Sequence, residues 1–169
     1  MAAKVVEELK QKTDAAYANL GRQLDGLDRH MERADAPGEW TTRQVLAHLC
    51  LPPGWNVGAL LRTFAERDLP LLEIKPGEAV VTPERKTMSA RQFLDTLDGQ
   101  RRDVYAYLES LPEADLERRK ARIPLFKEFM GTDEISIPRF VGAMFDYHWN
   151  DHAGQLAKIR KAAGLPEAR

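Results

Sequence analysis

Three histidines have the residue type and the spacing to bind a single metal ion. His148 and His152 are four residues apart, so a helix would place both imidazoles on one face, one turn apart. At that spacing, two ring nitrogens can reach one zinc ion at about 2.0–2.1 Å. His48 falls on the inward side of another predicted helix and could supply a third ligand. The spacing also fits a stacked pair of hydrogen-bonded core histidines, so both interpretations stay open on spacing alone.

The residues around the histidine pair narrow the chemistry. Zinc peptidases with a His-x-x-x-His motif need a glutamate directly after the first histidine as general base, and this chain has Trp149 there. A peptidase of that kind is therefore disfavoured. Asp151 is either a hydrogen-bond partner that orients an imidazole or a solvent-facing residue. His30 follows Arg29 near the end of a predicted helix, where cations are favourable, and it is not expected to be a ligand.

The other reactive or aromatic side chains are predicted to pack rather than to react. Cys50 lies two positions after His48, so on a helix it points away from the ligand face, and we interpret it as a small buried hydrophobic residue. It is the one cysteine of the sequence, which excludes an intramolecular disulfide. Trp149 and Tyr147 are expected in packing or surface positions, and Trp55 in the core or at a dimer interface.

Hydrophobic periodicity predicts four helices that would carry these residues. Their expected bounds are 3–31, 41–66, 89–110 and 136–163. At the start of the second helix, Thr41 is a candidate N-cap and Gln44 can complete a capping box. The Pro-Pro-Gly sequence at 52–54 predicts a break inside this helix, because proline lacks an amide donor and clashes with the preceding turn. A further short helix is expected over 112–119.

Two long connections, over about 68–88 and 111–135, separate the predicted helices. Antiparallel neighbours need only a few linking residues. The first connection is long enough to run the length of a bundle, so the second and third helices are expected to be parallel. The chain is therefore predicted to be all-α, a single four-helix-bundle domain over residues 1–169.

Composition disfavours several classes of partner. The formal net charge is -1, so no basic excess favours nucleic acid. Residues 1–11 carry acids and lysines among their apolar positions, unlike a signal peptide. No stretch approaches the length of about 18 apolar residues that spans a membrane. We expect a cytoplasmic protein with no nucleic-acid or membrane partner.

Two segments resemble the DinB-like (YfiT-like) superfamily of four-helix-bundle metalloenzymes. Residues 40–49, WTTRQVLAHL, are similar to its W-[ST]-x-[RK]-[ED]-x-L-x-H-L motif, which opens the second helix. Residues 148–156, HWNDHAGQL, are similar to its H-x-x-x-H-R-G-Q-[LI] motif on the fourth helix. The chain departs from the pattern at Ala153, where the family usually has arginine, and at the break over 52–54.

The resemblance implies an up-down-down-up bundle, frequent homodimers and a three-histidine site occupied by nickel or zinc. Carried over by position, the ligands are His48, His148 and His152. Characterised relatives include transferases that use low-molecular-weight thiols such as bacillithiol, and a mycothiol-dependent maleylpyruvate isomerase. We expect one divalent metal ion in this chain, zinc or nickel, with iron and manganese as alternatives.

The sequence thus predicts a divalent-metal-dependent enzyme that acts on a small-molecule substrate. The leading hypothesis is a thiol-dependent S-transferase or isomerase acting on small electrophiles, with a low-molecular-weight thiol as cosubstrate. The alternatives are a metal-dependent hydrolase and a non-catalytic small-molecule or stress-resistance binding protein. A homodimer is expected, with Trp55 and Phe64 extending an apolar face beyond the core.

Overall fold

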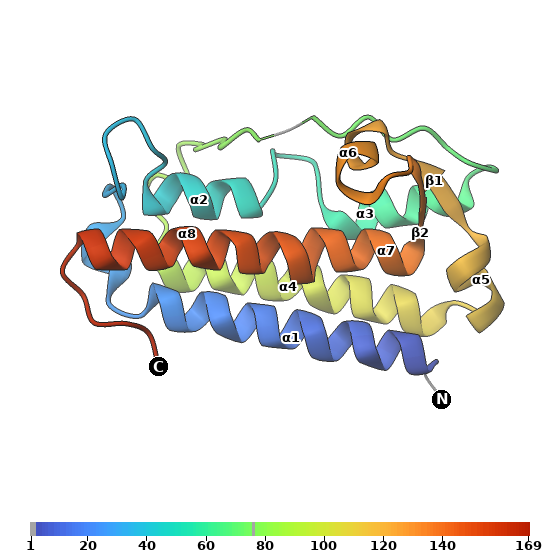
Figure 1. The fold of residues 1–169 in the computed structure, drawn as a ribbon, viewed down its shortest axis with the longest axis horizontal. Coiled ribbons are helices and arrows are strands. Elements are labelled where there is room, and N and C mark those ends of the chain that lie inside the picture. Colours follow the sequence, from blue (N-terminus) through green and yellow to red (C-terminus); the bar gives the residue numbers. More distant parts are fainter. Residues whose placement is uncertain (1–2, 76) are drawn as a thin grey trace.

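The computed structural model describes residues 3–75 and 77–169, which form a bundle of four long helical segments (Figure 1). The segments are α1, Lys4–Leu24; α2, Thr42–Leu49, followed by α3, Val57–Arg62; α4, Ala90–Ser110; and α7, Ile137–Val141, a π-helical turn, Gly142–Tyr147, and α8, His148–Ala162. Figure 1 shows α2, α3 and α4 running in one direction and α1 and α7–α8 in the other. The predicted up-down-down-up bundle is confirmed.

A crossover makes the second and third segments parallel. After a 3-10 turn, Thr63–Ala65, residues 66–75 and 77–89 return along the side of the bundle that α2 and α3 occupy (Figure 1). The Leu72 amide donates to the carbonyl of Arg122 at 2.9 Å, which attaches the first half of this connection to the segment between α4 and α7. The length of the connection was sufficient to predict this course.

The first helix is shorter than the predicted 3–31. α1 ends at Leu24, and Gly26 adopts a left-handed conformation with φ of 79°, which glycine accepts without a steric penalty. The chain then continues as a 3-10 turn, Leu27–His30. The helical spacing of apolar residues continues through both pieces, so hydrophobic periodicity alone predicted a single helix.

A buried arginine joins the end of α1 to the C-terminal segment. Arg160 of α8 is 5% exposed. Its guanidinium donates to the carbonyl of Gln23 at 3.0 Å and to that of Asp25. It also donates to the carbonyl of Pro166 at 2.8 Å. The first two bonds satisfy carbonyl groups at the end of α1, which a helix otherwise leaves unpaired.

The start of α2 and the break after it follow the sequence prediction. Thr41 Oγ1 accepts from the Gln44 amide at 3.2 Å, and Gln44 Oε1 accepts from the Thr41 amide at 2.9 Å, which completes the capping box. Helix α2 ends before residues 52–54. Leu51, directly before the two prolines, has a φ of 65°, a left-handed conformation that is strained for a side chain other than glycine.

The segment between α4 and α7 contains a small sheet that the sequence did not predict. Strand β1, Lys120–Arg122, pairs antiparallel with β2, Glu134–Ser136. The predicted short helix is present as α5, Glu113–Arg118, and further short turns follow as a 3-10 turn, Pro124–Phe126, and α6, Lys127–Met130. Three-residue strands are too short to show an alternating pattern, so their pairing could not be read from the sequence.

The core lies between the four segments and is rich in aromatic residues. Trp149 is 1% exposed, and Phe64 is 2% exposed with its ring 5.3 Å from that of Phe140. The expectation that Phe64 extends an apolar face beyond the core was therefore wrong. Trp55 is 48% exposed and lies between α2 and α3. Among the described residues, no helix combines the length and the hydropathy needed to cross a membrane.

Candidate metal centre

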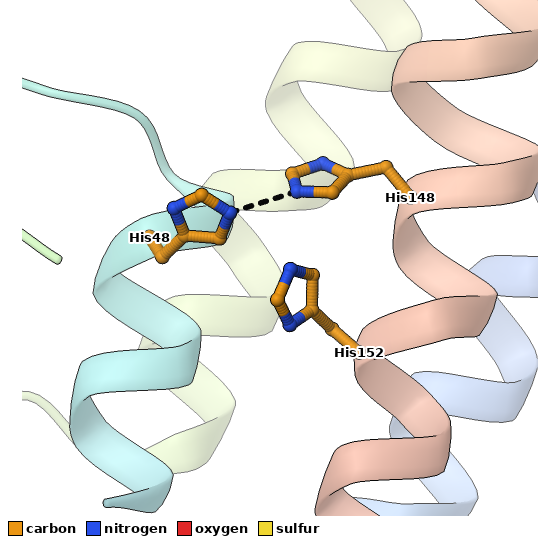
Figure 2. A group of neighbouring side chains, drawn as sticks. All are labelled: His48, His148 and His152. Carbon is orange, nitrogen blue, oxygen red and sulfur yellow. Dashed lines mark hydrogen bonds between the residues drawn. The ribbon is translucent and has the colours of Figure 1, made fainter. Parts of the chain in front are cut away.

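The bundle brings the three predicted histidines together. His48 lies in the last turn of α2, His148 is the first residue of α8, and His152 follows one turn later. Figure 2 shows the three rings facing one another between the two helices. The ring centroids of His48 and His148 are 4.9 Å apart, and both are 4.7 Å from that of His152. One ring nitrogen from each residue lies within 4.8 Å of the other two.

Hydrogen bonds determine which nitrogen of each ring faces the centre. His48 Nδ1 is 3.1 Å from the carbonyl of Glu78, and His152 Nδ1 is 2.8 Å from Gln155 Oε1. Because carbonyl and amide oxygens accept hydrogen bonds, Nδ1 of His48 and of His152 must carry the proton. Their Nε2 atoms are then left with a free lone pair directed at the centre.

Burial keeps the imidazoles of His48 and His148 neutral. It lowers the pKa of His148 to about 3, and the neighbouring His152 and His48 add to this effect. Burial also lowers the pKa of His48, while the Glu78 carbonyl opposes the shift. Near neutral pH the rings of His48 and His148 are therefore uncharged, which is the form in which imidazole binds metals.

The arrangement fits a bound cation. The Nε2 atoms of His48 and His148 are 2.8 Å apart, at hydrogen-bond distance (Figure 2). Without a metal, Nε2–H of a neutral His148 can donate to the free lone pair of His48, and a cation can take the place of that proton. Protonation of His148 is disfavoured by its low pKa. A divalent ion bound by Nε2 of His48, His148 and His152 satisfies all three rings, and neutral nitrogen donors suit zinc and its neighbours among the transition metals.

A tryptophan forms one wall of the centre. The Trp40 ring is stacked on that of His152, with centroids 6.2 Å apart and planes inclined by 13°, and lies 4.9 Å from the ring of His48. Trp40 precedes the capping box of α2, so the same local structure that starts the helix places the indole. Its apolar ring shields the imidazoles from water on this side.

The π-helical turn, Gly142–Tyr147, explains why the histidines lie beside the core rather than in it. The sequence placed His148 and His152 on one continuous apolar stripe. In the structure the buried stripe shifts by one position after this turn, to Trp149 and Ala153, which are both 1% exposed. A π-helical turn has more residues than an α-helical one, which rotates the following side chains. The two histidines are consequently half-buried and face α2.

The other candidate residues lie outside the centre. Asp151 is exposed. One of the two interpretations of Asp151 was that it orients an imidazole, and Gln155 has this role instead. His30 ends a 3-10 turn and is not a member of the cluster. Cys50 is 4% exposed, and burial raises the pKa of its thiol to about 11, as expected for a packing residue. Tyr147 is 67% exposed.

Sequence reasoning missed the partners of the imidazoles. Gln155 could have been found, because it lies three residues after His152 and therefore on the same side of a helix. Glu78 acts through its backbone carbonyl. A backbone carbonyl has no residue signature, so nothing in the sequence marks this position.

An up-down-down-up bundle with three converging histidines defines a class of protein, and the comparisons with known proteins agree. The chain belongs to the DinB superfamily, whose family model matches residues 6–156. None of the curated proteins matches the sequence significantly.

Solved structures share the fold over nearly the full chain. YfiT from Bacillus subtilis, described as a probable metal-dependent hydrolase with an unusual four-helix bundle topology, has a TM-score of 0.73 and 18% identity, with 98% of this chain and 92% of that chain covered. An uncharacterised protein from Clostridium difficile 630 has a TM-score of 0.62 and 12% identity, covering 95% and 98%. A protein from Streptococcus pneumoniae has a TM-score of 0.60 and 18% identity, covering 98% and 93%.

Proposed function

We propose that this chain is a metal-dependent hydrolase whose single divalent ion is held by His48, His148 and His152. The observation that carries the proposal is the convergence of their three ring nitrogens within 4.8 Å. YfiT, which shares the fold, is described as a probable metal-dependent hydrolase. That description favours hydrolysis over the thiol-dependent transfer that the sequence alone made the leading hypothesis.

The donor set suits catalysis better than a purely structural role. Three protein ligands leave at least one coordination position for water or substrate. A divalent ion held there supplies a Lewis acid that lowers the pKa of water and polarises a substrate oxygen. The residues of the chain hold and orient the site: the acceptors on Nδ1 fix the direction of the rings, and Trp40 restricts water on one side. Neutral ligands leave the charge of the ion undiminished.

Zinc or nickel is the proposed metal. Imidazole nitrogen binds both, and their affinities for a site of this kind exceed those of manganese and iron in the usual order of divalent metals. Elemental analysis of protein purified without a histidine tag tests the choice, and stoichiometric iron or manganese in place of zinc and nickel contradicts it.

Ligand variants test the site itself. Alanine at His148 removes a metal donor. Loss of an outer hydrogen-bond partner of a ligand lowers metal affinity about 10–100-fold, and loss of the ligand itself should lower it further. His30→Ala is the matched control and should bind metal as the wild type does, because His30 lies outside the cluster. Wild-type protein without metal uptake, or uptake that depends on His30 and not on His148, overturns the proposal.

An activity screen separates hydrolysis from thiol transfer. Metal-loaded protein is incubated with chromogenic carboxylic esters, amides and phosphate esters, and with small electrophiles, each in the presence and absence of low-molecular-weight thiols. The one thiol of the chain, Cys50, is buried and cannot replace an added thiol. Turnover that needs no thiol and is lost in His148→Ala supports the hydrolase. Turnover only with added thiol supports the transferase instead.

We also propose that the chain forms a homodimer, as the resemblance to its family implies. Several large apolar side chains are exposed on the single chain. They include Trp55, Leu69, Leu71 and Phe129. Burial of such side chains against a second copy removes apolar surface from water, which is favourable.

A further inference from the structure

An arginine in the crossover connection is bonded to the backbone on both sides of His48. The guanidinium of Arg85 donates from Nη1 to the carbonyl of Ala47 at 3.3 Å and from Nη2 to that of Leu51 at 2.8 Å. Nη1 also donates to the carbonyl of Val80 in its own connection at 2.9 Å. One planar group therefore holds together the C-terminal end of α2 and the segment that contains Glu78.

Arg85 is itself held in place by local structure. Its amide donates to Thr82 Oγ1 at 3.2 Å, which closes a turn. Its carbonyl accepts from Nη1 of Arg43 at 2.9 Å, and the same nitrogen donates to the carbonyl of Met88 at 2.8 Å. Arg43 belongs to α2, so the turn is attached to the helix by two arginines acting in opposite directions.

These contacts surround the hydrogen bond that orients the first histidine. The carbonyl of Glu78, two residues before Val80, accepts from His48 Nδ1 at 3.1 Å. Ala47 precedes His48, and Leu51 follows it in the left-handed conformation with φ of 65°. The acceptor for His48 is a backbone atom of residues 77–82, which form neither helix nor strand, so its position depends on the contacts that fix this stretch.

We propose that Arg85 is a positioning residue of the metal centre. By holding Val80 against Ala47 and Leu51, it keeps the Glu78 carbonyl on Nδ1 of His48, and thereby fixes the tautomer and direction of this ring. The inference rests on the proposed metal site for its effect on affinity, but its effect on the His48 tautomer does not need a metal. Lysine cannot replace Arg85, because a single ammonium lacks the planar fork that reaches several carbonyls at fixed angles.

The His48 tautomer in metal-free protein gives the first test. Nitrogen-15 chemical shifts of the imidazoles distinguish Nδ1–H from Nε2–H. In the wild type His48 should be mainly the Nδ1–H form, and in both Arg85→Gln and Arg85→Lys it should become a mixture of the two. A folded variant in which His48 keeps the wild-type tautomer overturns the proposal. So does a pair of variants that both fail to fold, because the role assigned to Arg85 is local.

Zinc affinity, measured by competition with a chelator, gives the second test. Arg85→Gln should bind zinc about 10-fold more weakly or worse, in the range found when an outer partner of a metal ligand is lost. Arg160→Lys is the matched control, because Arg160 of α8 also donates to three backbone carbonyls, but these belong to the end of α1 and to the C-terminal segment. It should lower the thermal midpoint without changing zinc affinity or the His48 tautomer.

The two tests separate failure of the inference from failure of the proposed function. If the wild type binds no zinc, the proposed function is wrong, and the tautomer comparison still decides the role of Arg85. If the wild type binds zinc and Arg85→Gln binds it equally well with the same tautomer, only the inference is wrong. If Arg160→Lys weakens zinc as much as Arg85→Gln does, the effect of Arg85 is general stability, and the positioning role is rejected.

Discussion

At the scale of single residues, the chemistry of the centre depends on the nitrogen that each imidazole turns inward. Acceptors on Nδ1 of His48 and His152 leave Nε2 of both rings free. Because these rings are already oriented, they lose less conformational entropy when the metal binds. The acceptor for His48 is a backbone carbonyl, whereas that for His152 is a side chain. Only the second can therefore be removed directly by mutation.

Gln155 provides that direct test. Gln155→Leu removes the acceptor 2.8 Å from His152 Nδ1, so zinc affinity should fall about 10–100-fold. Gln155→Glu keeps an acceptor oxygen and should retain zinc binding. Gln92→Leu is the control, because Gln92 forms the capping box of α4 and its loss should reduce stability without reducing affinity. Equal affinities in Gln155→Leu and the wild type would contradict the role assigned to this side chain.

Acidification should destabilise the metal-free protein before its carboxylates titrate. The pKa of His148 is lowered to about 3 by burial, whereas in the unfolded chain it is about 6.5. Between these values the unfolded state binds more protons, so stability rises with pH and is lost as pH falls from about 6.5 toward 3. The slope from this group is at most about 1.4 kcal/mol per pH unit.

Thermal midpoints of chelator-treated protein between pH 6.5 and 5 measure this slope. His148→Gln should flatten it, because glutamine does not titrate. A slope that is the same in His148→Gln as in the wild type would show that the buried imidazole is not its source.

The ligands could be predicted from the sequence, and their surroundings could not. His148 and His152 are identified by residue type and one-turn spacing, and His48 by the family motif. The carbonyl of Glu78 has no such mark, because any residue has a carbonyl and the crossover decides where it lies. The position of the histidines beside the core was also missed, because the π-helical turn Gly142–Tyr147 has no distinctive composition.

At the scale of elements, the two halves of the second segment have separate tasks. Helix α2 carries His48, while α3 is fixed to α4 by an ion pair in which Arg62 donates to both oxygens of Asp103 at 2.8 Å. The ring of Tyr107 lies 4.9 Å below the guanidinium. The break between the halves lets α2 end beside α8 while α3 follows α4. The residues that interrupt the helix can be recognised in the sequence, and so can the capping box.

Gly58 makes this attachment of α3 to α4 sterically possible. A Cβ there would lie 1.9 Å from Asp103 Oδ2 and 2.7 Å from Arg62 Nη1, so Gly58→Ala should break the ion pair. The side chains are partly exposed and can move, so the free energy of unfolding should fall by only about 1 kcal/mol, at the low end for overpacking. Denaturant unfolding monitored by circular dichroism measures the change.

Gly99→Ala is the matched control. Gly99 lies within α4, and a Cβ there meets no atom within 4 Å. Alanine is the better helix former, so this variant should gain about 0.5–1 kcal/mol. Opposite signs for the two substitutions are expected. A Gly58→Ala protein as stable as Gly99→Ala would mean that the ion pair does not hold α3 in the position described.

At the scale of the whole molecule, the crossover is what makes the site possible. Residues 66–75 and 77–89 return along α2 and α3 (Figure 1), so the chain passes His48 a second time and supplies the Glu78 carbonyl there. A short hairpin between the second and third helices would have left that nitrogen to solvent. Connection length predicted the parallel helices, yet the contact that results from them depends on the path of a loop, which helical periodicity does not encode.

The same side of the molecule carries the apolar surface that bears on assembly. Trp55 is 48%, Leu71 57% and Phe129 67% exposed. Figure 1 places the connection and α6 on the side of the bundle occupied by α2 and α3. Phe64, which the sequence assigned to this face, is in the core instead, so we expect the remaining side chains to provide the apolar centre of the proposed interface. A standard interface buries about 800 Å² on each partner.

Light scattering at micromolar concentration should therefore report about twice the chain mass of 19.2 kDa. Phe129→Ser combined with Trp55→Ser should shift the mass toward the single chain, because both substitutions replace apolar surface that association would remove from water. The same double variant should keep wild-type zinc affinity, since neither residue is a member of the histidine cluster.

Tyr147→Ser, which changes an exposed aromatic residue next to His148, is the comparison for a general effect of lost apolar surface. A wild-type mass of one chain across all dilutions would reject the dimer. A dimer unaffected by the double variant would place the interface on another face of the bundle.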